Sequence, residues 1–536
     1  MASSSLIIGL GIGIALVYVL IRVFSNSNSS TKHLRLPPGP KGLPIVGNVF
    51  DLPKPGELET HHWLKHKDLY GPISSVTVMG QTLVIVNDGE VVLELLEKRS
   101  AKNSSRPNQI FLNEMVGWKN SAAASPYNAR LRAYRTNLNR MIGNRTVASQ
   151  YDSVLETEVG HFLLHVLESP EKLAFHVRKT AGTMVLKMAY GYTAESHQSD
   201  PLIDAAQLIL DHFAEAAVPG AFKVDMFPFL RKLPDWLPGT GFKKLGRQYE
   251  AELTYVMEMP YAFTQHQRAL GAHEPSLLSR LLDASDETPE ELYTIKRSAL
   301  SLFAGGADTT VSSMMCFFLA MTIFPDAQRQ AQEEIDRVVG QDRLPNMADR
   351  DNLPYIEATV KEVLRWHPVA PIALPHLTTE EDIFEGYYIP KGAIIVPNFW
   401  AFTHDPNIYH DPMTFKPERY LGTGGREPEP DPRVFAFGFG RRVCAGSVFA
   451  ENSLYLSIVQ SLAVFNIKKF VENGREVDPH MEFSPGIISH PRPFKNLVEP
   501  RSPHHENLIR SLEKAYPWRK SDAEVLLSDD VMSLVP

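Results

Sequence analysis

Cysteine is scarce in this sequence: the 536 residues include only two. Two cysteines exclude a disulfide framework and a cysteine-based structural zinc site, and they suit a domain in a reducing compartment. Low-complexity runs, repeats and Ser/Gly-rich linkers are absent between residues 37 and 500, which favours one large catalytic domain over the roughly three or four that length alone suggests. No basic stripe accompanies the formal net charge of -8, which argues against nucleic acid as a partner.

One of the two cysteines, Cys444, lies among glycines and arginines directly before an apolar, helix-like stretch. Gly438 and Gly440 allow a tight turn with positive φ, so the backbone can fold closely around the sulfur. A position at a helix N-terminus, with Arg441 and Arg442 nearby, predicts a thiol that ionises easily, because the helix dipole and the guanidinium charges favour the thiolate. A thiolate is either a metal ligand or a nucleophile.

The rest of the chain separates these two roles. A nucleophilic cysteine needs a base, usually a histidine. A haem thiolate needs an apolar slot, cations for the propionates and a helix that handles oxygen. A buried, inert cysteine is the common alternative, but it leaves the spacing of arginine and glycine without a cause. The spacing Phe437-x-x-Gly440-x-Arg442-x-Cys444-x-Gly446 is similar to the haem-binding signature of the cytochrome P-450 family.

This resemblance covers roughly residues 36 to 500 and implies both a fold and a cofactor. The implied fold class is mainly α with a small β region, the cytochrome P-450 fold, preceded by one N-terminal transmembrane helix. The implied cofactor is heme b, with its iron bound axially by Cys444. By the same resemblance Arg442, Phe437, Gly438 and Gly446 contact the haem.

Between Arg297 and Asp326 the only charged residue is Asp308. The length permits a membrane span, but central glycines, threonines and an aspartate favour a helix buried in a large domain. Paired glycines and a threonine that bonds back to a carbonyl can open one helical turn, which makes a groove for a diatomic ligand. An acid beside a hydroxyl in a dry helix suits dioxygen activation. The family pattern (Ala/Gly)-Gly-x-(Asp/Glu)-Thr-(Thr/Ser) implies that Thr309 is the proton-relay hydroxyl and Asp308 the acid upstream.

Two further basic residues are candidates for propionate contacts. A predicted helix from Asn128 carries Arg135, and the family places Trp-x-x-x-Arg on this helix, although Leu131 stands where tryptophan is usual. His376 follows Pro375 at the place where family members put a basic residue near a propionate. A solvated basic face and a satisfied core histidine are the ordinary alternatives.

The sequence Glu362-x-x-Arg365 places two opposite charges on one helix face. Most such pairs are surface salt bridges of little energetic value. In the family this pair is buried and joined by an arginine from Pro-Glu-Arg-Phe, represented here by Arg419 with Tyr420 in place of phenylalanine. The resemblance implies that Glu362, Arg365 and Arg419 hold the cysteine loop and take no part in the chemistry.

Four segments are expected along the chain: a membrane anchor at 1–24, a tether and proline-rich hinge at 25–40, the catalytic domain at 41–500 and a tail at 501–536. The anchor follows from an uncharged, apolar N-terminus with basic residues on its C-terminal side, which leaves the main domain in the cytosol. A frayed helix is expected in the tail.

Two loops and two strands are also expected. β-branched runs at 73–78 and 82–87 predict strands. The segment 111–126 is expected to form an irregular loop over a ligand cavity. The aromatic, proline-rich connector at 222–242 suits a membrane interface, and it resembles fungal microsomal members of the family that oxidise secondary metabolites.

The resemblance thus implies a haem-dependent monooxygenase anchored in the endoplasmic reticulum membrane. Its expected substrate is a small lipophilic secondary metabolite of the polyketide, terpenoid or indole class, oxidised with O2. No flavin or nicotinamide fingerprint occurs in the chain, so electrons are expected from a separate NADPH-dependent flavoprotein reductase. A haem-thiolate isomerase, dehydratase or peroxide user, and a non-catalytic haem-binding ligand carrier, are the alternatives.

Overall fold

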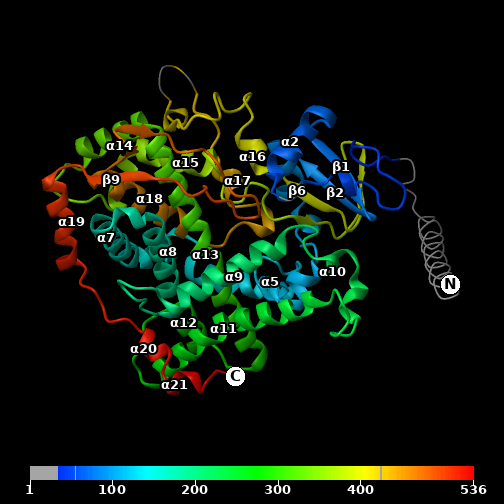
Figure 1. The fold of residues 1–536 in the computed structure, drawn as a ribbon, viewed down its shortest axis with the longest axis horizontal. Coiled ribbons are helices and arrows are strands. Elements are labelled where there is room, and N and C mark those ends of the chain that lie inside the picture. Colours follow the sequence, from blue (N-terminus) through cyan, green and yellow to red (C-terminus); the bar gives the residue numbers. More distant parts are fainter. Residues whose placement is uncertain (1–33, 55, 423–424, 426, 536) are drawn as a thin grey trace.

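The computed structural model describes residues 34–54, 56–422, 425 and 427–535. The predicted anchor at 1–24 and most of the predicted tether lie outside these residues. The described chain is mainly helical with three small sheets, which confirms the predicted fold class apart from the transmembrane helix. The small sheet of β1, β2 and β6 lies at one end of the molecule, and the helices form the larger remainder (Figure 1).

The helices are α2 (Glu59–Tyr70), α3 (Gly89–Val92), α4 (Ser100–Asn103), α5 (Ala129–Ile142), α6 (Arg145–Ala148), α7 (Asp152–Glu168), α8 (Leu173–Tyr190), α9 (Pro201–Ala217), α10 (Lys223–Met226), α11 (Gly241–Ala269), α12 (Leu277–Asp283), α13 (Pro289–Ile323), α14 (Pro325–Val338), α15 (Pro354–Trp366), α16 (Phe399–Thr403), α17 (Arg433–Ala436), α18 (Ser447–Val464), α19 (Pro503–Ala515), α20 (Ala523–Leu526) and α21 (Asp529–Met532). The strands are β1 (Ile73–Val78), β2 (Gln81–Val86), β3 (His376–Leu377), β4 (Asp382–Phe384), β5 (Tyr387–Ile389), β6 (Ile394–Pro397), β7 (Phe465–Glu472), β8 (Arg475–Val477) and β9 (Asn496–Pro500).

Helix α13 runs through the centre of the helical part and packs against α5, α8 and α18. It begins with a capping box, in which Thr288 and Glu291 satisfy each other's backbone N–H groups, and with Pro289 in the first turn. Within the described residues it is the one helix long and apolar enough to cross a membrane, and 72% of its apolar window is buried inside the protein. The sequence-based choice of a core helix over a membrane span is consistent with this burial.

The largest sheet has the strand order β1-β2-β6-β3. β1 and β2 form an antiparallel hairpin in which Ile73 pairs with Val86, and both predicted strands are confirmed to within a residue. Met79 and Gly80 turn the chain with positive φ. β6 then pairs parallel to β2 and antiparallel to β3, so the sheet joins the N-terminal part of the chain to the segment that follows α15.

The segment 111–126 is packed more tightly than predicted. A π-helix, η3 (Ile110–Met115), and a 3₁₀ helix, η4 (Trp118–Asn120), replace the first part of the expected loop. The ring of Trp118 is 4% exposed and meets Phe213 edge to face, with the ring centroids 4.8 Å apart. The aromatic side chains drive this packing, because each buries a large apolar area when it finds a partner.

The C-terminal tail packs onto the domain, so the prediction of a frayed helix is wrong. α19 packs against α7, and α20 and α21 pack against α11. After α19, the indole of Trp518 stacks on His161 with the ring centroids 4.0 Å apart and also contacts the rings of His165 and His197. The amphipathic face of α19, with Ile509 fully buried, explains why the tail is ordered.

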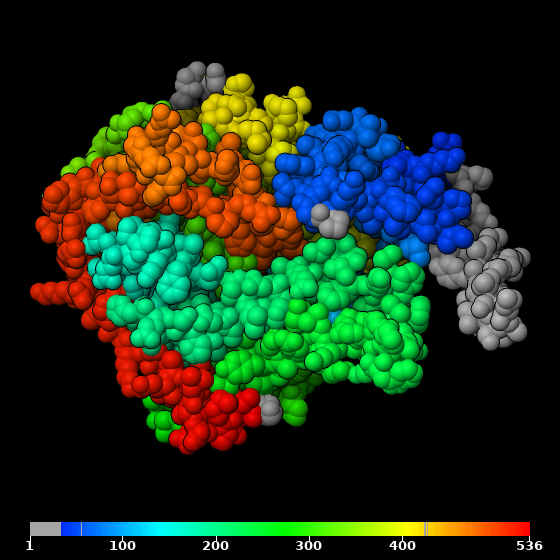
Figure 2. Space-filling view, viewed as in Figure 1, coloured from blue at the N-terminus to red at the C-terminus, as the bar shows by residue number. Residues whose placement is uncertain are grey.

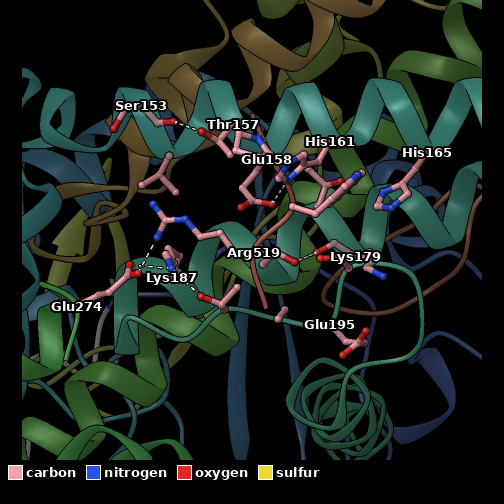
Figure 3. A pocket seen from close by; sticks show the side chains of 18 residues that line it. Ser153, Thr157, Glu158, His161, His165, Lys179, Lys187, Glu195, Glu274 and Arg519 are labelled. Atoms are coloured by element: carbon pink, nitrogen blue, oxygen red, sulfur yellow. Dashed lines mark hydrogen bonds and ion pairs between the residues drawn. The ribbon is translucent and has the colours of Figure 1, made fainter. Parts of the chain in front are cut away.

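A cavity of about 270 Å³ lies between α7, α8 and the tail (Figure 3). Lys187 from α8 and Arg519 from the tail converge on the carboxylate of Glu274, each at 2.7 Å. His165 also lines this cavity, and burial lowers the pKa of His165 to about 3. The tail is therefore held by stacking, ion pairs and a histidine that is neutral in the folded state.

Large apolar side chains are exposed at the end of the molecule that carries the small sheet. Ile45 and Phe50 are 64% and 81% exposed, and Phe229 and Trp236 in the connector after α10 are 61% and 80% exposed. These two segments lie at the same end of the molecule, coloured dark blue and green at the right of Figure 2.

Candidate functional site

Cys444 lies in a turn between the 3₁₀ helix η10 (Gly440–Arg442) and α18. Gly438 and Gly440 have φ values of 79° and 51°, which confirms the predicted positive-φ turn. A Cβ atom at position 440 would lie 2.5 Å from the carbonyl oxygen of Leu96, so the backbone can approach that closely only at a glycine. The N–H of Cys444 donates to the carbonyl of Phe437 at 2.7 Å and closes the loop around the sulfur.

The thiol of Cys444 is harder to ionise in the polypeptide than predicted. Burial raises its pKa, while the N–H of Gly446 and the charge of Arg135 act in the opposite direction. Arg441 and Arg442 direct their guanidinium groups to other partners, so the cation that acts on the sulfur comes from α5 and not from the loop itself. A metal cation at the sulfur reverses this balance, because a coordinating thiol is deprotonated.

Three arginines around the loop, one buried (Arg442) and two partly buried (Arg106 and Arg135), have no carboxylate partner among the described residues. Arg442 donates to the carbonyls of Ser104, Ala122 and Ser125, Arg106 to those of Ala123, Leu374 and Pro375, and Arg135 to that of Val443. Burial lowers the pKa of Arg442 to about 10, holds the pKa of Arg106 well below its usual value and also lowers the pKa of Arg135. Buried cations that are not neutralised favour an anionic ligand.

Arg106 was not among the site residues predicted from the sequence. It stands between Ser105 and Pro107, outside the haem signature, and nothing in its spacing distinguishes it from a surface arginine. Its hydrogen bonds to residues 374 and 375 reach across 268 and 269 positions of the chain. Only the folded chain therefore places this arginine beside Arg442.

His376, the predicted propionate contact, is 2% exposed at the start of β3. Its Nδ1 lies 2.7 Å from the carbonyl oxygen of Asn103, and burial together with the charge of Arg106 holds its pKa well below the usual value. The imidazole is therefore neutral, and Nδ1 carries the proton because a carbonyl can only accept. A negatively charged group at Nε2 would raise the pKa and favour the doubly protonated ring.

The two central glycines of α13 have different surroundings. A Cβ at Gly305 would have no neighbouring atom within 4 Å, whereas a Cβ at Gly306 would lie 2.7 Å from Cγ2 of Val185 on α8. Gly305 therefore leaves space, and Gly306 serves close helix packing. The hydroxyl of Thr309 donates back to the carbonyl of Gly305 at 2.8 Å, as predicted. α13 remains a continuous helix through both glycines, so the predicted open turn is absent.

Asp308 is 8% exposed on α13. Its Oδ2 lies 3.1 Å from Nε2 of His490, which belongs to the long loop between β8 and β9. His490 was not among the residues predicted from the sequence. The two residues are 182 positions apart, and a histidine in a Pro-rich loop carries no local signal for such a contact.

Comparison with known proteins identifies the family. A family model for cytochrome P450 matches residues 37–498 of the chain. The chain belongs to the cytochrome P450 family. Among the similar relatives, cytochrome P450 monooxygenase claR of Ampulloclitocybe clavipes is 48% identical, covering 92% of this chain and 91% of the relative. Cytochrome P450 monooxygenase ppsD of Aspergillus oryzae is 46% identical (92% and 94%), and O-methylsterigmatocystin oxidoreductase of Aspergillus flavus is 41% identical (91% and 92%).

Membership makes this protein an oxidoreductase, a P450 monooxygenase of the fungal type, and P450 enzymes in general carry a haem held by a cysteine thiolate. The residues present fit such a group. The side chain of Cys444 is accessible, although burial by the surrounding protein raises the pKa of its thiol. A Cβ at Gly446 would lie 3.9 Å from the sulfur, and glycine keeps that side open. The uncompensated arginines match the two carboxylates that a haem carries.

The structure brings Glu362, Arg365 and Arg419 together in the interior of this P450. Arg365 makes a bidentate pair with Glu362, with both N–O distances 2.8 Å, and Nε of Arg419 lies 3.1 Å from the same carboxylate. Glu362 and Arg365 are fully buried. The alternative of a solvated surface pair is thereby excluded. α15, which carries the first two residues, packs against α17 just before the cysteine loop.

Proposed function

We propose that this P450 hydroxylates or otherwise oxidises a small lipophilic secondary metabolite, of the polyketide, terpenoid or indole class, with O2 and with electrons from an NADPH-dependent flavoprotein reductase. Heme b is the proposed cofactor, with Cys444 as the axial iron ligand. The observation that carries the proposal is an accessible thiol in a glycine turn, close to three arginines that have no carboxylate partner among the described residues; Arg442 is buried, and Arg106 and Arg135 are partly buried. That charge pattern suits a dianionic, thiolate-bound group and does not suit an inert core cysteine.

The polypeptide contributes ligation, charge neutralisation and proton supply. Arg106, Arg135 and Arg442 would neutralise the haem carboxylates, and His376 would join them once a carboxylate approaches its Nε2. The bound haem supplies the oxidising chemistry on dioxygen. Asp308 on α13 would supply protons through its carboxyl group, and Thr309 offers a hydroxyl one residue further along the helix.

The proposed substrate class rests on relatives and on the space at one glycine. The relative from Aspergillus flavus is an oxidoreductase of O-methylsterigmatocystin by name. Of the paired glycines of α13, Gly305 has open space at its Cβ position, whereas Val185 fills the space beside Gly306.

We also propose single-pass anchoring in the endoplasmic reticulum membrane with the catalytic domain in the cytosol. Two observations support it: the apolar, uncharged N-terminal sequence and the exposed side chains of Ile45, Phe50, Phe229 and Trp236 at one end of the domain. A lipophilic substrate dissolved in that membrane would be close to the enzyme.

The experiment that tests the cofactor assignment is the reduced carbon-monoxide spectrum of the full-length protein in membranes. Wild type is expected to give the red-shifted band of a haem thiolate, and Cys444→Ser is expected to lose it. Cys316→Ser is the matched control, because Cys316 is the other cysteine, is fully buried in α13 and lies outside the proposed site. A red-shifted band that survives in Cys444→Ser would refute the ligand assignment.

The monooxygenase activity itself is tested by Thr309→Ala in the presence of the reductase. Weaker coupling and more peroxide per NADPH are expected, whereas a haem-binding ligand carrier would bind ligand unchanged and an isomerase would turn over without NADPH. Comparison of the metabolites made with and without the protein identifies the substrate.

A further inference from the structure

The contact between His490 and Asp308 is the starting point. In the described part of the chain, His490 is the one side chain that bonds to the Asp308 carboxylate. The side chain of Asp308 is 11% exposed and that of His490 is 29% exposed. A carboxylate so far inside an apolar helix needs a donor, because an unpartnered buried charge is costly. One donor on one oxygen also fixes the rotation of the carboxyl group.

The loop that carries His490 is itself closed and rigid. The N–H of Ser484 donates to the carbonyl of His490 at 2.8 Å, and the N–H of His490 donates to the hydroxyl of Ser484 at 2.9 Å. The hydroxyl of Ser489 donates to the carbonyl of Ser484 at 2.7 Å. These reciprocal bonds make residues 484–490 a small ring whose tip is 485–488.

The same loop is tied to α13 and to the segment after α15. Ser312, one helical turn beyond Asp308, donates from its hydroxyl to the carbonyl of Ser489 at 2.6 Å. His367 bonds the Ser489 hydroxyl at 2.9 Å, and the N–H of Ser489 donates to the carbonyl of Val369 at 2.9 Å. The position of His490 relative to Asp308 is therefore set by several bonds that do not involve Asp308.

We propose that His490 is a positioning residue for Asp308, a role that rests on the proposed monooxygenase function. Its Nε2–H donates to Oδ2 and holds the carboxyl group in one orientation, which leaves Oδ1 free to exchange a proton with water or with a neighbouring hydroxyl. The hydrogen bonds within residues 484–490 fix the position of His490. The orientation of the Asp308 carboxyl group is therefore set by this loop and not by α13 itself. No net proton transfer is needed for this role, because the imidazole keeps its proton.

The test uses the full-length holoenzyme with its reductase, without added substrate, and follows NADPH and O2 consumption together with peroxide. One NADPH per O2 corresponds to peroxide formation, and two per O2 correspond to water formation, which requires protons at the distal oxygen. His490→Leu is expected to lower the rate of water formation on the order of tenfold, within the range that general acids contribute. It should also change the solvent deuterium isotope effect on O2 consumption, a readout that loosened packing alone does not move.

Three further variants separate positioning from structure. His490→Gln places an amide N–H close to the position of Nε2, so it is expected to restore water formation to within about threefold of wild type. Ser312→Ala removes one bond between the same helix and the same loop but leaves the His490–Asp308 contact and the loop's bonds to His367 and Val369, so it is expected to keep the NADPH to O2 ratio of wild type. In an Asp308→Asn background, His490→Leu is expected to add no further loss, because residues that act through one group are not additive.

A readout independent of turnover is backbone amide hydrogen exchange. His490→Leu and Ser312→Ala are expected to raise exchange in residues 484–490 to a similar degree, although only the first changes the NADPH to O2 ratio. If His490→Leu matches Ser312→Ala in that ratio, or if His490→Gln is as impaired as His490→Leu, the positioning role is refuted. Loss of the haem-thiolate spectrum or of NADPH-dependent O2 consumption in wild type would instead refute the proposed function.

Discussion

Removing the charge of Glu362 is predicted to be among the most destabilising single changes in this protein. Its carboxylate accepts hydrogen bonds from both Arg365 and Arg419, and from the backbone N–H of Lys416 at 2.8 Å. Burial alone would lower the pKa of Arg365, but the charge of Glu362 raises it above its usual value. Arg419 keeps a second carboxylate, Glu429, whereas Glu362 is the one carboxylate that pairs with Arg365 among the described residues.

Glu362→Gln therefore leaves the Arg365 guanidinium buried and without an anion. Removing one partner of a buried ion pair costs about 3–5 kcal/mol. A chain of this length unfolds with an entropy of about 1.1 kcal/mol/K, at roughly 2.1 cal/mol/K per residue, so the apparent Tm is expected to fall by roughly 3–5 °C. Thermal unfolding followed by intrinsic fluorescence and by haem absorbance measures both the fold and the cysteine loop that α15 supports.

Two companion variants make this result decisive. Glu333→Gln removes the same charge from an exposed pair with Arg329, whose side chains are 62% and 58% exposed, and is expected to cost about 0.5 kcal/mol or less. Replacing both Glu362 and Arg365 with apolar residues of similar size should recover most of the loss, because no uncompensated charge remains. If Glu362→Gln melts within 1 °C of the Glu333→Gln control, roughly 1 kcal/mol on the same scale, the account of the buried charge is wrong.

Three other changes test separate parts of the structure. Gly306→Ala is expected to cost about 1–3 kcal/mol through overlap with Val185, whereas Gly305→Ala should keep the melting temperature and reduce the spectral shift that a bulky ligand induces. Arg106→Met should stabilise the haem-free protein and speed haem transfer to apomyoglobin by about 10- to 100-fold, because each hydrogen bond to a charged group is worth about 1.5–3 kcal/mol. Folding stability should fall as the pH drops from 6.5 toward 3, because the folded-state pKa of His165 is depressed to about 3 and the unfolded chain binds the proton first. Melting temperatures measured against pH should fall less steeply in His165→Gln than in wild type.

Features encoded by short stretches of sequence could be predicted. The hairpin of β1 and β2 follows from two β-branched runs around Met79 and Gly80, and α5 begins where the side chain of Asn128 caps it by accepting the N–H of Leu131. The cysteine loop was predictable for the same reason, since positive φ at Gly438 is a property of the backbone within a few residues. Each of these structures depends on the conformational preferences of a few neighbouring residues, and these preferences can be read from the sequence.

Features that depend on contacts between distant segments could not be predicted. Arg106 and His490 have ordinary neighbours in sequence and become functional candidates only through partners more than 180 positions away. The error about the acidity of Cys444 has a similar origin, because helix dipole and nearby arginines are visible in the sequence whereas the desolvation that outweighs them is not. The order of the tail likewise depends on Trp518 meeting histidines that lie on other elements.

Two groups of arginines in the interior or partly buried differ in how their charge is balanced. Arg365 and Arg419 are as deeply buried as Arg442, but carboxylates of the chain neutralise them. Arg442 and Arg106 have only backbone carbonyls, which solvate a cation without cancelling its charge. An anionic ligand beside these arginines would be stabilised by that uncancelled charge. This difference supports the proposal that Arg106 and Arg442 neutralise the haem carboxylates, whereas Arg365 and Arg419 serve the fold.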